Sequence, residues 1–189
     1  MNAIVKKGKL SELIYQYRGY IPLPLLLIVL IWSRPSLWSY IIGTSILFLG
    51  ESIRIWAAGY IQQYRGSKIE AEHLITGGPY AYIRNPLYLG NFFIGLGCCI
   101  ISRLFFSFPL FLLLYLVGYG IIIPREESYL EQKFGEEYTN YSHTVPRLIP
   151  RFKKITSPTG SFQWQVILTK EIYTIIILAT IIIIFTLKR

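Results

Sequence analysis

Two polar segments carry most of the side chains that are able to do chemistry, and both lie between apolar stretches. The first, residues 77–90, places three phenols and a guanidinium within a short distance along the chain: Tyr80, Tyr82, Tyr88 and Arg84. The second, residues 125–150, mixes glutamates with basic residues. A charge beside an apolar run is costly unless it is compensated, and a bound ligand would compensate it. The pattern therefore predicts a polar ligand site set in an apolar scaffold.

The first segment has the sequence of a shaped loop that leads into a helix. Gly77 and Gly78 allow backbone angles that other residues avoid. Pro79 and Pro86 fix φ and favour extended geometry in the residue before them. The tyrosines and Arg84 are therefore expected to take defined places just before an apolar helix.

Composition indicates a membrane protein. The chain has 189 residues, the length of one domain, of which 53% are hydrophobic, and its mean hydropathy is +0.45. The formal net charge of +9 comes from 19 basic residues and 10 glutamates. These charges are divided among short segments between apolar spans, which argues against the continuous basic face of a nucleic-acid binder. The expected partner is the membrane, with no nucleic acid.

Metal binding is not expected. The two cysteines are the adjacent pair Cys98 and Cys99 inside an apolar stretch, which is neither a disulfide framework nor normal metal-ligand spacing. The two histidines, His73 and His143, lie in different polar segments. Packing is the expected role of the cysteines.

The hydrophobic runs predict an all-α, polytopic integral membrane protein with about five transmembrane helices. The expected spans are residues 20–32, 37–61, 87–108, 109–123 and 166–187. Four regions follow: an amphipathic N-terminal segment (1–18), two transmembrane helices (19–61), a catalytic core of ligand loops and a helical hairpin (62–150), and a linker with the C-terminal helix (151–189). The basic N-terminus places itself and the ligand pocket on the cytoplasmic side.

Two further features concern helix packing and pocket closure. Leu130, Phe134 and Tyr138 recur at helical spacing, which predicts a short amphipathic helix over 126–141, interrupted near Gly135, that closes over the ligand. Small residues let membrane helices approach. Packing within the hairpin is accordingly expected at Gly90, Gly95, Gly97, Gly118 and Gly120.

Glu51 and Arg54 interrupt the second apolar run. They are three residues apart, so a helix places them on one face, where they can pair and lower the cost of burying either charge. Either the two form a structural ion pair near the membrane interface, or Arg54 lines the ligand pocket.

Several motifs occur in order between residues 50 and 150. They are His-Leu-Ile-Thr-Gly-Gly-Pro-Tyr from His73, Arg-Asn-Pro-Leu-Tyr-Leu-Gly from Arg84, Glu126-Glu127, Phe134-Gly135-Glu136-Glu137-Tyr138, Tyr141 and Val145-Pro146-Arg147. In these motifs the chain resembles the isoprenylcysteine carboxyl methyltransferase and phospholipid N-methyltransferase superfamily. The resemblance implies an integral membrane enzyme that uses S-adenosyl-L-methionine to methylate a membrane-embedded lipid or lipidated acceptor. No Gly-x-Gly-x-x-Gly follows a predicted strand, which excludes a soluble-type methyltransferase domain.

The same resemblance implies site residues. The catalytic candidates are Arg84 and Glu127. The cofactor would contact Glu72, His73, Leu74, Ile75, Tyr80, Asn85, Pro86, Tyr88, Glu126 and Arg147. The acceptor would contact Arg54, Tyr82 and Arg125.

Two departures from the family pattern concern the acceptor. The prenylcysteine enzymes have His where this chain has Asn85, and the eukaryotic ones carry a substrate-binding Arg where it has Ile122. Both weaken the case for a prenylcysteine carboxylate and leave a phospholipid amine as an alternative. In an amine methylation, Glu127 or His73 is the candidate base. An alternative of another class is a non-catalytic membrane scaffold with interfacial tyrosines and prolines.

Overall fold

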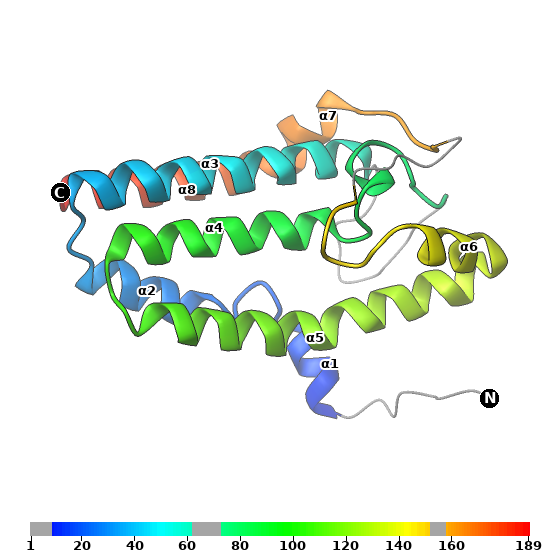
Figure 1. Cartoon of the computed structure of the whole chain (residues 1–189), viewed down its shortest axis with the longest axis horizontal. Coiled ribbons are helices and arrows are strands. Elements are labelled where there is room, and N and C mark those ends of the chain that lie inside the picture. The colour runs from blue at the N-terminus through cyan, green and yellow to red at the C-terminus, as the bar shows by residue number, and fades with distance from the viewer. Residues whose placement is uncertain (1–8, 62–72, 152–157) are drawn as a thin grey trace.

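The computed structural model describes residues 9–61, 73–151 and 158–189, and this part of the chain is helical, with no β-strand. The long helices run along the long axis of the molecule (Figure 1). The elements are α1 Lys9–Gln16, α2 Leu23–Trp32, α3 Leu37–Tyr60, the 3₁₀ turn η1 Gly78–Ala81, α4 Pro86–Ser102, α5 Ser107–Phe134, α6 Glu136–Thr144, α7 Trp164–Val166, the π-helical turn η2 Ile167–Glu171 and α8 Ile172–Leu187. The expected all-α fold is confirmed for these residues.

Two helices, α3 and α5, are long and apolar enough to cross a membrane by length and composition. Helices α2, α4 and α8 are apolar but shorter. At about 1.5 Å per residue, α2 rises about 15 Å, which is half of a hydrocarbon core of about 30 Å. Because α7, η2 and α8 follow one another without a break, the last apolar run is helical from 164 to 187. The count of five spans stays a prediction.

Helices α3 and α4 make the most extensive contact of any two helices. A Cβ added to Gly50 would lie 2.7 Å from the Gly90 carbonyl oxygen, and one added to Gly97 would lie 2.6 Å from the Gly43 carbonyl oxygen. The two glycines of each helix are two turns apart, so the antiparallel backbones touch at two levels. Small residues thus bring these two helices together.

The expectation that the glycines of 87–123 pack α4 against α5 is therefore wrong for most of them. Gly90 and Gly97 face α3, because α3 has its own glycines at the matching spacing. Gly95 does face α5, where an added Cβ would meet the ring of Phe111 at 2.2 Å. Around Gly118 and Gly120, no described atom lies within 4 Å of an added Cβ.

Helix α5 continues through Pro124, although the sequence predicts that the fourth span ends there and a separate helix begins at Glu126. A proline inside a helix removes one backbone hydrogen bond, which membrane helices tolerate when neighbouring groups compensate. As a result Glu126 and Glu127 project from the same helix as the apolar run. The predicted interruption is confirmed at Gly135, whose φ of +54° ends α5 before α6 begins.

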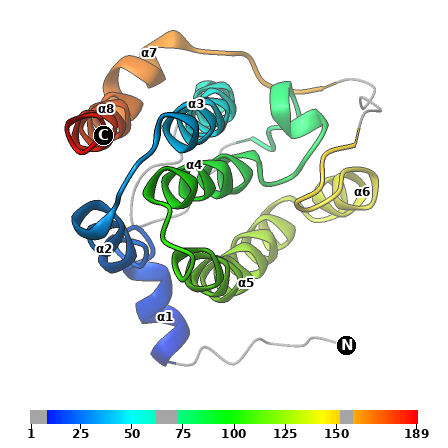
Figure 2. The ribbon, with the colours of Figure 1, turned by 60° about the vertical axis from the view of Figure 1, so that its left-hand side comes forward.

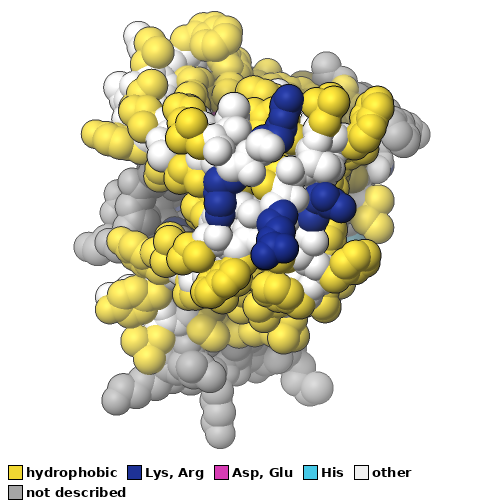
Figure 3. Space-filling view, turned by 90° about the vertical axis from the view of Figure 1, so that its left-hand side faces the viewer, with side chains coloured by type: hydrophobic (Ala, Val, Ile, Leu, Met, Phe, Trp, Pro, Cys, Tyr) yellow, Lys and Arg dark blue, Asp and Glu magenta, His cyan; other side chains and the backbone are white. Residues whose placement is uncertain are grey.

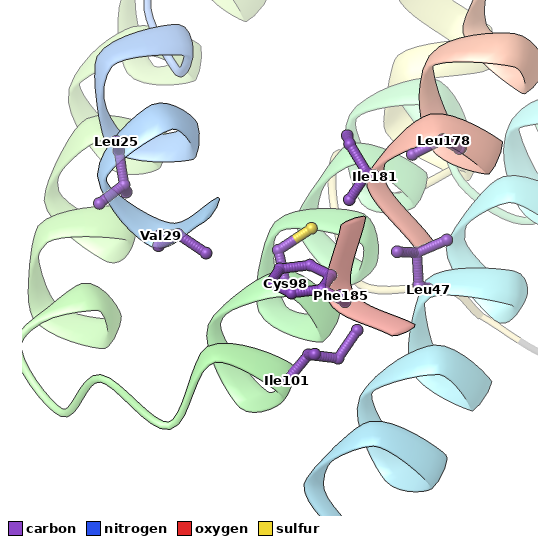
Figure 4. Close-up of a cluster of buried hydrophobic side chains, with 8 residues drawn as sticks. All are labelled: Leu25, Val29, Leu47, Cys98, Ile101, Leu178, Ile181 and Phe185. Carbon is purple, nitrogen blue, oxygen red and sulfur yellow. The ribbon is translucent and has the colours of Figure 1, made fainter. Parts of the chain in front are cut away.

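The apolar core lies where α2, α3, α4 and α8 meet, as Figure 4 shows. Its buried members are Leu25, Val29, Leu47, Cys98, Ile101, Leu178, Ile181 and Phe185. Both cysteines are buried and free, and Cys98 belongs to this cluster, which confirms the packing role.

The remaining segments gather at one end of the bundle. In Figure 2 the helices are seen more nearly end on, with α4 lying between α3 and α5. The loop with η1, helix α6 and the chain that follows it all lie at the end where α3 finishes and α4 begins (Figure 1). Helix α1 packs against α5. The two polar segments of the sequence are thus brought to the same end.

Candidate functional site

A cavity of about 900 Å³ lies among the polar segments at this end. Its walls come from the last turns of α3, the loop before α4, the first turns of α4, the second half of α5, and α6. Arg18, which follows α1, and residues 159–161, which precede α7, complete the lining.

Backbone hydrogen bonds join the first polar segment to the second. The Arg84 amide donates to the Pro146 carbonyl at 2.9 Å, and the Arg151 amide donates to the Tyr82 carbonyl at 3.0 Å. The Tyr141 hydroxyl of α6 donates to the Tyr80 carbonyl at 2.9 Å. Because residues 79–86 have two prolines and make little regular structure, these cross-links fix the loop against α6.

Glu127 connects three partners from both polar segments. One carboxylate oxygen, Oε2, accepts from Arg147 Nε at 2.9 Å and from Arg147 Nη2 at 2.5 Å. The other, Oε1, accepts from Asn85 Nδ2 at 3.2 Å and lies 3.6 Å from Arg84 Nε. The Asn85 amide also donates to the Arg147 carbonyl at 3.1 Å. Glu127 is buried, and its charge is balanced by two guanidinium groups.

Glu126 lies on the cavity wall one residue earlier on α5. Its Oε2 accepts from the Tyr88 hydroxyl at 2.6 Å. The Tyr88 ring lies 4.5 Å from the ring of Tyr119, and the Tyr115 hydroxyl donates to the Tyr88 carbonyl at 3.1 Å. These contacts fix Tyr88 between α4 and α5. The hydrogen bond from Tyr88 then holds the Glu126 side chain in one orientation at the cavity wall.

A second buried ionic cluster surrounds Arg54, which also lines the cavity. Its guanidinium lies 3.3 Å from Glu51 of the same helix and 3.3 Å from Glu171 of η2, and it donates to the Asn91 side-chain oxygen. Glu171 is fully buried. Buried charges of opposite sign offset each other's desolvation cost. Both alternatives for Arg54 therefore hold: it is a structural ion-pair partner and a cavity residue.

Residues 158–163 form a third part of the site, although the sequence predicts a linker there. The Gly77 amide donates to the Thr159 carbonyl at 2.7 Å, and the Thr159 hydroxyl donates to the Leu74 carbonyl at 2.6 Å. Gly160 has a φ of +97°, and an added Cβ would lie 3.2 Å from Ile75. Thr, Gly and Ser are common in flexible linkers. The composition therefore gives no sign that this segment pairs with residues 74–77.

Two tyrosines of α6 line the cavity with protonated hydroxyls. Burial raises the pKa of Tyr138 and of Tyr141, the latter also through the neighbouring phenol. Both side chains thus stay neutral hydrogen-bond donors at ordinary pH.

Most of the predicted site residues meet in this cavity. They are Arg54, His73, Leu74, Ile75, Tyr80, Arg84, Asn85, Pro86, Tyr88, Glu126 and Glu127. Glu72 lies outside the described residues.

Three predicted site residues lie away from the lining. The Tyr82 ring packs 6.3 Å from the ring of Trp56. The Arg125 guanidinium lies over the ring of Tyr15 on α1, 4.6 Å from its centroid. Arg147 reaches Glu127 from outside, with half of its side chain exposed.

The cavity also has residues outside the predicted site set: Arg18, Asn91, Tyr138, Tyr141, Thr159, Gly160 and Ser161. Of these, Tyr138 and Tyr141 belong to the helix over 126–141 that the sequence predicts to close over the ligand. Asn91 carried a usable signal, because a carboxamide in an apolar helix needs a polar partner. Its amide donates to the Tyr119 hydroxyl at 2.9 Å. Arg18 is one of several basic residues around an amphipathic pattern, and nothing in the sequence distinguishes it from the others.

Comparisons with known proteins agree on a family. Residues 38–137 match the phospholipid methyltransferase family model. The chain is 36% identical over 104 residues to the protein-S-isoprenylcysteine O-methyltransferase of Schizosaccharomyces pombe, covering 54% of this chain and 44% of that protein. It is 30% identical over 118 residues to the nickel-cobalt-cadmium resistance protein NccN of Alcaligenes xylosoxydans xylosoxydans, covering 58% of this chain and 52% of that protein.

A solved structure of a eukaryotic intramembrane Ras methyltransferase, isoprenylcysteine carboxyl methyltransferase, aligns with a TM-score of 0.48 and 23% identity, covering 82% of this chain and 56% of that one. The chain spans about half the length of the two curated relatives above. The family model covers more than half of the chain, from α3 to the first turn of α6, and includes Arg84, Glu126 and Glu127. The chain belongs to the phospholipid methyltransferase family.

Proposed function

We propose that the chain is an S-adenosylmethionine-dependent methyltransferase whose acceptor is a lipid or lipidated molecule of the bilayer. The observation that carries this proposal is the single cavity into which the two polar segments project, with Glu126, Arg84 and Tyr88 on its wall. Sites for small molecules and cofactors have volumes of about 300–1,000 Å³. A cavity of about 900 Å³ therefore has room for the cofactor together with the reacting group of an acceptor.

The residues on the wall suit the polar groups of the cofactor. S-adenosylmethionine carries a carboxylate, an amino group and ribose hydroxyls. Arg84 lines the cavity, and its guanidinium, whose Nε lies 3.6 Å from Glu127, is suited to bind the cofactor carboxylate as well. Glu126 is suited to the amino group or a hydroxyl as an acceptor.

The protein's contribution to such a reaction is mainly positional. When bound, the cofactor supplies a methyl group on a sulfonium, and the methyl moves to the acceptor while the sulfur keeps the bonding electron pair. The chain must hold the nucleophile in line with that bond and exclude water. Glu127, whose oxygens are engaged by Arg147, Asn85 and Arg84, fits a positioning role better than the role of a base.

Lateral entry of the acceptor is supported by a row of aromatic rings between α4 and α5. The ring of Phe92 lies 5.1 Å from that of Tyr115, Tyr115 lies 4.6 Å from Tyr119, and Tyr119 lies 4.5 Å from Tyr88 at the cavity. Aromatic rings are favourable beside both acyl chains and head groups. We propose that the acceptor's chain lies along this row with its head group at Tyr88.

A phospholipid amine is the second candidate acceptor, beside a prenylcysteine carboxylate. Ile122 stands where the eukaryotic prenylcysteine enzymes have a substrate-binding Arg, and it is an uncharged residue with 1% of its surface exposed. Arg125 is turned to Tyr15. Neither position therefore offers a cation to an acceptor carboxylate. An amine must lose a proton before it attacks, and His73 on the cavity wall is the better-placed base. The methylation rate would then rise with pH as the amine loses its proton.

No metal is proposed for this site. The described residues hold no group of three or more His, Cys, Asp or Glu side chains placed to bind a metal ion. The name of the NccN relative refers to metal resistance of that protein. The site residues discussed above suit an organic cofactor.

We also propose that the cavity opens to the cytoplasm. The basis is the basic N-terminus and the Lys and Arg residues of the polar segment 125–151, which lies at the cavity end. A Ser142→Cys variant, with the label site on α6, should react with a membrane-impermeant thiol reagent from the cytoplasmic side. Labelling from the opposite side only would show that the cavity opens away from the cytoplasm.

Methyl transfer can be tested with cofactor labelled in the methyl group. Purified protein in nanodiscs of total membrane lipid is incubated with it, and the extracted lipids are then treated with alkali. A methyl ester releases its label as methanol, whereas a methylated amine keeps it, so one experiment separates the two acceptors. Glu126→Gln should lose incorporation, and Glu131→Gln, an exposed residue of the same helix, should keep it. No label in any lipid would favour the non-catalytic scaffold.

A further inference from the structure

The end of the bundle opposite the cavity carries a cluster of cations, and no described acidic side chain lies near it. Arg34 links α2 to α3, Arg103 links α4 to α5, and Lys188 and Arg189 follow α8, and all four are exposed. Figure 3, which views this end, shows basic side chains grouped among apolar ones, and no acidic side chain is visible among the coloured residues. We call these four residues the basic end cluster.

Contacts confirm that the four residues lie together. The Arg34 amide donates to the Ser102 carbonyl at 3.2 Å, which places Arg34 beside Arg103. Lys188 Nζ donates to the carbonyls of Leu30 and Ile31, at 2.7 and 2.6 Å, which places it at the end of α2 just before Arg34. Arg189 lies over the ring of Tyr40, 5.6 Å from its centroid.

No carboxylate side chain is available nearby to balance these charges. The sequence has no acidic residue between Glu12 and Glu51, between Glu72 and Glu126, or after Glu171. The Arg34 and Arg103 side chains make no hydrogen bond, ion pair or ring contact with the described residues. Arg103 also adopts φ +60° at the end of α4, a left-handed conformation that is unfavourable for a residue with a side chain.

Helix dipoles do not explain the cluster. Three helix C-termini, of α2, α4 and α8, and two N-termini, of α3 and α5, lie at this end (Figure 1). With about half a charge at each terminus, the dipoles sum to roughly −0.5. Four side-chain cations therefore leave most of their positive charge uncompensated.

Aromatic side chains surround the cluster in the manner of a membrane interface. Trp38 is 72% exposed, Phe105 at the tip of the α4–α5 turn is 92% exposed, and Trp32 is 59% exposed. Trp is enriched at the level of lipid head groups, and apolar rings insert just below it. The long apolar helices end at this same level (Figure 1).

We propose that the basic end cluster binds the phosphate of anionic phospholipid head groups in the leaflet opposite the cavity. Arg34 and Arg103 supply the free guanidinium groups, and Lys188 and Arg189 add charge from the end of α8. A Lys or Arg near an anionic lipid surface contributes about 1 kcal/mol, which is roughly a fivefold change in binding. This site is separate from the cavity and does not depend on the proposed methyl transfer.

The test uses tryptophan quenching in vesicles. The full chain carries Trp56→Phe and Trp164→Phe, so that Trp32 and Trp38, both beside the cluster, are the remaining emitters. It is reconstituted in phosphatidylcholine vesicles that contain increasing amounts of either dibrominated phosphatidylglycerol or dibrominated phosphatidylcholine. Quenching gives the relative binding of the two lipids at this end. We expect a preference for phosphatidylglycerol on the order of tenfold.

Two matched variants separate the cluster from net charge. Arg34→Gln with Arg103→Gln removes two contributions of about fivefold each, so most of the preference should be lost. Because these exposed side chains make no hydrogen bond, ion pair or ring contact with the described residues, the fold should be unaffected, which circular dichroism checks. Lys133→Gln with Arg151→Gln removes the same charge from the cavity end and should keep the full preference. Equal binding of the two lipids, or an unchanged preference in the arginine variant, would overturn the proposal. Loss of the phosphatidylglycerol preference in excess inorganic phosphate would also overturn the proposal, because the cluster would then be a site for free phosphate.

Discussion

The two ends of the helix bundle are held together by different forces. At the cavity end, segments of irregular chain are joined by long polar side chains, with Glu127 and Arg54 each connecting three or more partners. In the opposite half, α3 and α4 touch through Gly43 and Gly97, and α2 and α8 cover them with apolar side chains. Directional polar contacts leave a cavity between the segments that they join, whereas close helix packing fills the space.

The largest effect is expected at Glu127. Replacing it with Ala leaves Arg147, Arg84 and Asn85 without their shared acceptor, and breaking a buried pair typically costs about 3–5 kcal/mol. Thermal unfolding in detergent should show this loss, and residues 145–151 should become more sensitive to limited proteolysis. Glu131→Ala, at an exposed position of α5, is the control. Equal stability of the two variants would mean that Glu127 does not hold the cavity together.

A smaller effect is expected from adding a methyl group between α3 and α4. In Gly97→Ala the new Cβ would meet the Gly43 carbonyl at 2.6 Å, and such overpacking costs about 1–3 kcal/mol. Gly120→Ala places a methyl group where no described atom lies within 4 Å, so better helix propensity should make it neutral or stabilising by about 0.5–1 kcal/mol. Unfolding temperatures of the two variants compare them directly. If both are equally stable, glycine contact does not hold this half.

The smallest effect on stability is expected from removing one hydrogen bond at the cavity end. Tyr141→Phe removes the hydrogen bond to the Tyr80 carbonyl, which is worth about 1 kcal/mol, and leaves the ring in place. Because burial raises the pKa of Tyr141, the wild-type hydroxyl stays protonated, and this difference should not change between pH 6 and about 9. Tyr173→Phe, at a residue that is 70% exposed, should have no effect. A difference that fades as pH rises would show that Tyr141 ionises.

The helical elements and the main site motifs were predictable because their signals are local. Apolar runs locate the helices, Gly135 marks the break before α6, and the spacing of Glu51 and Arg54 predicts their pairing. The motif residues around Arg84 and Glu126 meet in one cavity as expected.

Longer-range features were less accessible from sequence. The partner of Gly90 and Gly97 depends on which helix lies opposite, and no local pattern contains that information. The pairing of Thr159 with residues 74–77 joins segments far apart in the chain. Pro124 usually ends a helix, yet α5 continues through it, because membrane helices tolerate such a break.

We propose that the cavity binds S-adenosylmethionine through Glu126. Isothermal titration of the purified full chain with this cofactor tests it, using Glu126→Gln and the exposed Glu131→Gln of the same helix. Loss of a charge-assisted hydrogen bond costs about 1.5–3 kcal/mol, so Glu126→Gln should weaken binding roughly tenfold to a hundredfold. Glu131→Gln should bind as the wild type does. Undetectable cofactor binding by the wild type, or equal affinity of a folded Glu126→Gln variant, would contradict the claim.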